Sequence, residues 1–235
     1  MKPGLKQLGL LAGMMFAASV LPVSAAEELS SIARGGRLYD KYFQENKTAK
    51  PTADHAAYPK KGGEYGKDTS WRCKECHGWD GLGKDGAYSK GGHATDIKGV
   101  NGYWGKAPAD IAAIIRNPVH GYTEAMLSAK DVSDLSLFVA KGMPDMTKYV
   151  DAANNKSKGD GAKGEGYYNT LCIGCHGADG KKITTGPSLG SVASNGWEMM
   201  HKVMNGQPGE AMPSMRAFDP QVASDIVVHL QTLPK

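Results

Sequence analysis

The sequence contains two copies of the motif C-x-x-C-H, and together they use every cysteine in the chain. The first copy runs from Cys73 to His77 and the second from Cys172 to His176. On one helical turn, thiols at positions i and i+3 point to the same side, so both can bond to one flat group. The pattern is typical of a covalently attached c-type haem, with both cysteines forming thioethers and the histidine binding iron.

Other uses of four cysteines fit this spacing less well. A structural zinc site would place the second pair about 15–20 residues after the first, whereas 95 residues separate Cys76 from Cys172. Disulfides or thioredoxin-like redox pairs would not require a histidine after each pair. The sequence therefore predicts two covalently bound haem c groups, attached through Cys73, Cys76, Cys172 and Cys175 and bound at iron by His77 and His176.

The composition is short of residues that build a hydrophobic core. Leu, Ile, Val and Phe together make up 39 of 235 residues, and the formal net charge is only +4. This balance argues against a highly charged disordered chain, a membrane channel and an enzyme with a large aliphatic core. The basic residues form no stripe, so a nucleic-acid partner is not expected. Two large apolar macrocycles would supply the missing core.

The first 25 residues have the pattern of an export signal. Lys2 and Lys6 precede an apolar run from Leu8 to Leu21, and small residues follow at Val23–Ala25, as a signal peptidase requires. The run is shorter than the ~20 residues of a membrane helix, although an uncleaved anchor is the alternative. We expect residues 1–25 to be a signal peptide, and the mature chain to be periplasmic with no stable membrane span.

The second half resembles the class I cytochrome c family. Gly164 and the aromatic residues before Cys172 match the first helix of that family, and Gly177, Asp179 and Gly180 follow the motif as they do there. The segment Gly186–Leu189 then supplies the family's proline. The resemblance implies an all-α fold in which the carbonyl of Pro187 accepts a hydrogen bond from His176 and fixes its tautomer.

The same resemblance implies a methionine as the second iron ligand, from the loop before the last helix. Met212 is followed by Pro213, as in the family, and lies seven residues before Asp219, where the last helix is expected to begin. Met215 is the alternative, but it has less chain available to fold over the haem.

The first half follows the same plan with two departures. Gly35–Tyr39 resembles the start of the family's first helix, but an insert at about 44–72 separates it from the haem motif. This insert is expected to be a surface loop, with His55 in solvent. No proline matches Pro187, because Asp96–Gly99 occupies its place. The carbonyl that would orient His77 is therefore not evident.

The second iron ligand of the first half has more than one candidate. The last helix is expected to begin at Ser128, where spacing to Asp131 indicates a capping box. His120 lies eight residues before this cap, close to the spacing of Met212, whereas Met126 lies only two residues before it. We favour His120, with Met126 and then His93 as the alternatives.

These copies predict an all-α protein with two tandem cytochrome c-like domains, at 27–145 and 158–235, joined by a polar linker at 146–157. The leading hypothesis is a dihaem carrier that relays single electrons between redox partner proteins, or does so as a subunit of a larger complex. The alternative is a haem oxidoreductase with an open or displaceable ligand at the first haem. A haem-based sensor or a structural subunit is a third hypothesis.

Overall fold

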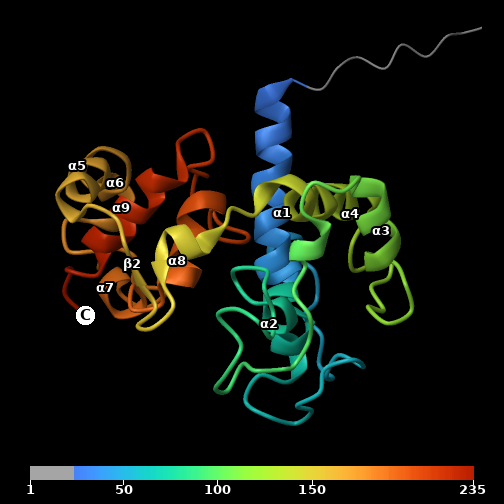
Figure 1. The fold of residues 1–235 in the computed structure, drawn as a ribbon. Helices are drawn as coiled ribbons and strands as arrows, with labels where there is room; N and C mark the ends of the chain where they lie inside the picture. Colours follow the sequence, from blue (N-terminus) through green and yellow to red (C-terminus); the bar gives the residue numbers. More distant parts are fainter. Residues whose placement is uncertain (1–23) are drawn as a thin grey trace, which may run out of the picture.

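The computed structural model describes residues 24–235, so the expected signal peptide lies almost wholly outside the described residues. The regular secondary structure of the described residues is helical apart from one short hairpin, and long loops join the helices (Figure 1). In the first half the elements are α1 Ala25–Glu45, η1 Lys67–Trp71, α2 Cys73–His77, η2 Asn101–Tyr103, α3 Pro108–Ile115, α4 Ala129–Leu137 and the π-helical turn η3 Phe138–Gly142. They continue with η4 Met146–Lys148, β1 Val150–Asp151, β2 Lys156–Ser157, α5 Gly161–Leu171, α6 Ile173–His176, α7 Leu189–Val192, α8 Gly196–Asn205 and α9 Pro220–Leu230.

Each half is built on two helices that cross at a glycine. In the first half α1 crosses α4, and a side chain at Gly35 would overlap the carbonyl of Asp134. In the second half α5 crosses α9, and a side chain at Gly164 would overlap the carbonyl of Asp225. Glycine is needed at both points because backbone lies directly on backbone. The same crossing of a first and a last helix is thus present in both halves.

The helix starts agree with the sequence signals. Ser128 caps α4 in a capping box with Asp131, and Asp219 caps α9 immediately before Pro220. Ser24 and Glu27 form a further capping box at the start of α1. No helix of the described residues is long and apolar enough to cross a membrane.

The segment expected to be a polar linker is more ordered than its composition indicates. Residues 146–157 form a turn and an antiparallel hairpin in which Val150 pairs with Ser157. Met146 and Val150 are buried in the same apolar cluster as α8 and α9. The polar residues that suggested a linker lie at the exposed tip of the hairpin. Two apolar residues, Met146 and Val150, pack it against the second half.

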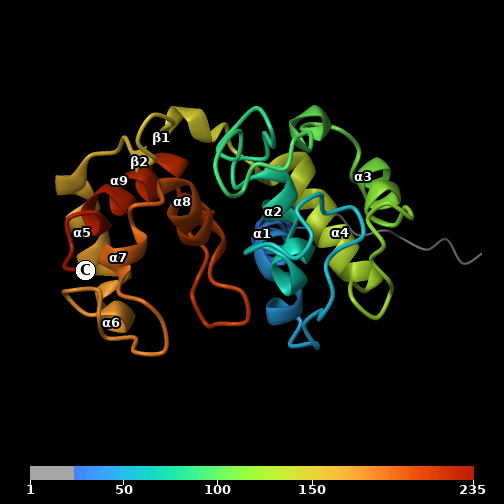
Figure 2. The ribbon, with the colours of Figure 1, turned by 90° about the horizontal axis from the view of Figure 1, so that it is seen from below.

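The two halves pack against each other through α8 and α1 (Figure 2). A side chain at Gly36 would overlap Asn205, so these helices also approach closely. The buried carboxylate of Asp40 on α1 lies 2.7 Å from the ammonium of Lys202 on α8 and also pairs with Arg72. These charges hold the pKa of Asp40 well below its usual value, although burial acts in the opposite direction. A buried ion pair of this kind fixes the register of the two helices.

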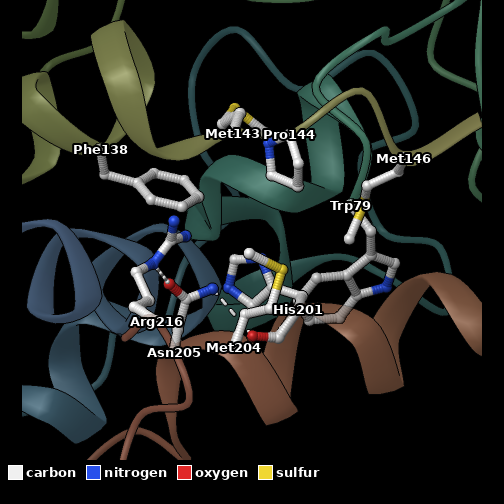
Figure 3. A pocket seen from close by; sticks show the side chains of 9 residues that line it. All are labelled: Trp79, Phe138, Met143, Pro144, Met146, His201, Met204, Asn205 and Arg216. Carbon is white, nitrogen blue, oxygen red and sulfur yellow. Dashed lines mark hydrogen bonds between the residues drawn. The ribbon is translucent and has the colours of Figure 1, made fainter. Parts of the chain in front are cut away.

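A buried histidine lies at the centre of this contact (Figure 3). The Nε2 of His201 donates to the carbonyl of Gly36, at 2.9 Å, and its ring packs 5.0 Å from that of Trp79. Phe138 contacts the same ring edge-on, and the guanidinium of Arg216 lies over Phe138. The small cavity shown in Figure 3 is lined by residues of both halves. Each half keeps its own apolar cluster, and aromatic side chains of the first half close the contact around His201.

The glycine crossing predicts a specific cost for a single methyl group. Gly164→Ala should destabilise the haem-loaded protein by about 1–3 kcal/mol, because the α5 and α9 backbones must move apart. Gly166→Ala is the matched control, since Gly166 lies on the same helix with open space around it, and it should stabilise α5 by about 0.5–1 kcal/mol. Urea unfolding followed by circular dichroism measures both. Equal effects of the two substitutions would contradict the crossing.

The buried His201 predicts a pH-dependent stability. Burial lowers the pKa of His201 to about 4 in the folded chain, although Asp40 and the Gly36 carbonyl act to raise it. An unfolded histidine has a pKa near 6.5, so the unfolded state binds the extra proton between about pH 6.5 and pH 4. The stability contributed by the neutral ring is present above this window and is lost as the pH falls through it.

Replacing His201 with Gln, which can still donate to the Gly36 carbonyl, should remove this dependence. The loss of unfolding free energy between pH 7 and pH 4.5 should be smaller in His201→Gln than in the parent by roughly 2–3 kcal/mol. Urea unfolding at the two pH values tests this. Identical losses in the two proteins would show that His201 does not titrate on unfolding.

Candidate functional site

The first C-x-x-C-H motif is held against α1 by a tyrosine. The motif forms the short helix α2, and the hydroxyl of buried Tyr39 donates to the carbonyl of Gly78, at 2.8 Å. Gly78 has a φ of +78°, which turns the chain sharply after His77. Tyr39 lies one turn after Gly35 on α1. The same helix therefore makes the crossing with α4 and positions the chain just after His77.

The second motif is held by the same kind of contact. The hydroxyl of Tyr168, one turn after Gly164, donates to the carbonyl of Gly177, at 2.6 Å. Gly177 has a φ of +76°, and burial raises the pKa of Tyr168 to about 12, so the hydroxyl keeps its proton. In both halves, a tyrosine of the preceding helix thus bonds to a glycine of positive φ that comes directly after the motif.

The downstream segments also correspond. The amide of Val100 donates to the carbonyl of Gly81, and the amide of Leu189 donates to the carbonyl of Gly180, at 2.7 and 3.1 Å. Counting back two residues from Val100 and Leu189 places Lys98 at the position that Pro187 has in the second half. This register matters because a backbone carbonyl at that position can orient the histidine of the motif.

Lys98 performs this orienting role in the first half. The Nδ1 of His77 donates to the carbonyl oxygen of Lys98, at 2.7 Å, which leaves Nε2 with a free lone pair. On the other side, the Nδ1 of His120 lies 3.2 Å from the Oδ1 of Asn117 and donates to it. With the proton on Nδ1, the Nε2 of His120 carries a lone pair as well. Both rings are therefore held in the tautomer that binds a metal through Nε2.

The rings of His77 and His120 lie close to each other. Their centroids are 6.3 Å apart and their planes are inclined by 32°. Two metal–imidazole bonds of about 2 Å, extended by the radius of each ring, give about 6 Å between centroids. The separation therefore fits one iron between the two rings.

The protonation of both rings suits iron binding. Burial lowers the pKa of His77 below its usual value, and the nearby His120 lowers it further, against the hydrogen bond to Lys98. Burial also lowers the pKa of His120, against a hydrogen bond to the backbone of Ile114, and neighbouring His55 lowers it further. Both rings are therefore neutral near pH 7, and neutral imidazole is the form that coordinates a metal.

The other two candidates for this position have different surroundings. His93 is stacked between Tyr65 and Tyr88, and its Nδ1 lies 2.9 Å from the carboxylate of Glu75. Met126 is half-buried and lines an open pocket on the surface together with Arg34. The residue that lies opposite His77 is His120.

The second motif has a more open environment. Cys175 is exposed, and exposed apolar side chains at Leu171 and Ile183 flank the motif. Burial lowers the pKa of His176, but within the described chain its ring makes no hydrogen bond, and Pro187 is exposed. The hydrogen bond expected from His176 to the Pro187 carbonyl is therefore absent from this structure, although Pro187 has the corresponding register.

The loop that carries the two methionine candidates folds back onto α8. Ser214 donates to the carbonyl of Met204, and the amide of Met215 donates to the carbonyl of Val203. The side chain of Met215 packs against the apolar cluster of the second half. Met212 is half-buried, and its carbonyl lies against Gly206, which has a φ of +89°. Met212 stays the predicted iron ligand on its spacing and on Pro213.

Sequence reasoning missed three residues around the first motif. His55 was expected in solvent, but it is only 6% exposed, because Trp71 and Tyr122 enclose its ring. The Lys98 carbonyl has no signal in the sequence, since any residue provides one. Asn117 could have been found, because an Asn three residues before a histidine can reach that histidine across a turn.

The two motifs differ in how far they are covered. Lys74 and Glu75, the variable residues of the first motif, are buried and paired with each other at 2.8 Å. In the second motif Gly174 and Cys175 are exposed. The first motif is thus enclosed within the first half, while the second lies at the surface.

Comparison with known protein families finds a match in the second half. The family described as cytochrome C oxidase, cbb3-type, subunit III matches residues 159–230, which contain the second motif and the α5–α9 crossing. No curated protein matches the sequence. The matched family implies covalently bound haem c, and the motif, the left-handed glycine and the helix crossing fit that cofactor. The match supports a c-type cytochrome domain at residues 159–230, and such a domain is typical of haem proteins that transfer electrons.

Proposed function

We propose that this chain is an exported dihaem cytochrome c that relays single electrons between redox partner proteins, as a free carrier or as a subunit of a larger complex. The observation that carries the proposal is that the same helix crossing, tyrosine hydrogen bond and positive-φ glycine surround both C-x-x-C-H motifs. Tyr39 and Tyr168 make the same contact behind the two histidines. A second haem domain within residues 27–145 is the simplest reason for this repetition.

The proposed cofactors are two haem c groups, each supplying one-electron chemistry at its iron. His77 and His120 are the proposed axial ligands of the first iron, and His176 and Met212 those of the second. The separation of the His77 and His120 rings, 6.3 Å between centroids, supports the first pair. A methionine ligand raises the reduction potential, so we propose that the second haem has the higher potential.

We propose that the second domain is the one that exchanges electrons with a partner protein. The exposed Cys175 and the apolar residues Leu171 and Ile183 support the second domain as the side that meets a partner. The first motif is enclosed, but Trp79, two residues after His77, lies against His201 on α8. This packed contact supports electron transfer between the two domains, because close packing improves electronic coupling between them.

The enzyme hypothesis is less well supported. A catalytic haem needs an open or displaceable position at iron. In the first half that position faces His120, whose ring is held by Asn117. The oriented ring favours a six-coordinate iron that changes only its charge, which is the state a relay requires.

The proposed export follows from the sequence and the cofactor together. The basic and apolar pattern of residues 1–25 is that of a signal peptide. Covalent haem attachment in an exported compartment accords with it, and we propose a periplasmic location. Cleavage after Ala25 would remove Ser24, the cap of α1, at a cost confined to the exposed first turn.

Replacing the proposed distal ligand should open the first haem alone. His120→Ala in the haem-loaded protein should convert about half of the reduced haem from slow to fast carbon monoxide binding. Met126→Leu is the matched control, since it alters the competing candidate and should leave carbon monoxide binding unchanged. Stopped-flow absorption measures the two haems as separate phases. Fast binding in Met126→Leu with no change in His120→Ala would transfer the assignment to Met126.

A further inference from the structure

The insert before the first motif contains a buried histidine, His55, whose two ring nitrogens each form a hydrogen bond. The backbone amide of Ala57 donates to the Nδ1 of His55, at 3.1 Å. The Nε2 of His55 then carries the proton and donates to the carbonyl oxygen of His120, at 2.7 Å. The backbone amide of His55 also donates to Ser70, at 2.8 Å. His55 is therefore a fixed donor aimed at the loop that carries His120.

Aromatic packing fixes the same ring from the sides. Trp71 contacts His55 edge-on, with centroids 4.5 Å apart, and Tyr122 lies at 6.0 Å. The hydroxyl of Tyr122 donates to the carbonyl of Trp71, at 2.6 Å. Because Trp71 lies two residues before Cys73 and Tyr122 two residues after His120, His55 sits where the two sides of the first haem site meet.

The loop that carries His120 has little other support. Pro118, Val119 and Gly121 are exposed, and Val119 is 63% exposed. The remaining hydrogen bonds of the loop are local, from Asn117 and from the end of α3. Among the described residues, His55 is the one distant in sequence that forms a hydrogen bond to Asn117–Gly121. Without it, the backbone of His120 would be held only by its own turn.

We propose that His55 is a positioning residue for His120. It holds the His120 backbone so that the ring faces His77, and so keeps the first iron six-coordinate and closed to small molecules. The insert at about 44–72 thereby contributes directly to the site. This inference rests on the proposed assignment of His120 as an iron ligand.

Two conservative substitutions separate the two bonds of the ring. In His55→Gln the amide nitrogen takes the place of Nε2 and can still donate to the His120 carbonyl. In His55→Asn the shorter amide takes the place of Nδ1, so it can bond to Ala57 but cannot reach His120. Both keep a polar side chain of similar kind, so a difference between them reports the bond to His120.

Carbon monoxide binding to the reduced, haem-loaded full chain measures how often the iron opens. Losing a hydrogen bond of about 0.5–1.5 kcal/mol should increase opening at the first haem about two- to tenfold. His55→Asn should therefore speed that phase about two- to tenfold, while His55→Gln stays close to the parent. The phase of the second haem should not change in either variant. Lys61→Gln, which alters an exposed side chain of the same insert, should leave both phases unchanged.

The carbon monoxide results for the His120 and His55 variants test the ligand assignment and the role of His55 separately. If His120→Ala opens the first haem but His55→Asn and His55→Gln both bind carbon monoxide at the parent rate, the role of His55 is overturned and the ligand assignment stands. If His120→Ala changes nothing, the ligand assignment itself fails. Equal acceleration in Asn and Gln variants would show that His55 acts through packing rather than through the bond to His120, which also overturns the inference.

Discussion

The close crossing of two helices at a glycine is the contact on which both halves of the molecule depend. Gly35 and Gly164 let backbone lie directly on backbone, and each helix then brings a tyrosine hydroxyl to the carbonyl just after a motif histidine. A buried tyrosine hydroxyl needs a partner, so its position and that of the motif are fixed together. In the first half, the carbonyl of Lys98 then orients the ring of His77.

The first half modifies this frame without abandoning it. A lysine carbonyl replaces the proline carbonyl at the back of His77, and this substitution works because the backbone oxygen alone is used. The distal side carries a histidine on an exposed loop, held in place by an insert. Asp40, Lys202 and His201 join this half to the second through α1 and α8. The distance between the two sites is therefore set by helix packing rather than by a flexible tether.

The motifs, the helix caps at Ser128 and Asp219 and the glycine crossing were accessible from the sequence, because each has a local signature. The Lys98 carbonyl and the buried His55 were not, since the first has no side-chain signal and the second is buried only by contacts made after folding. The same holds for the hairpin at 146–157, whose polar composition describes its tip. The contact between Trp79 and His201 joins residues far apart in sequence, and no local pattern predicts it.

The central claim is that two haems occupy equivalent frames, the first between His77 and His120 and the second between His176 and Met212. Low-temperature electron paramagnetic resonance of the oxidised protein, with integrated intensities, tests this most directly. The account predicts two low-spin ferric signals of equal intensity in each chain, one from two imidazole ligands and one from an imidazole and a thioether. A single low-spin haem per chain, or a high-spin signal from the first haem in the native protein, would contradict it.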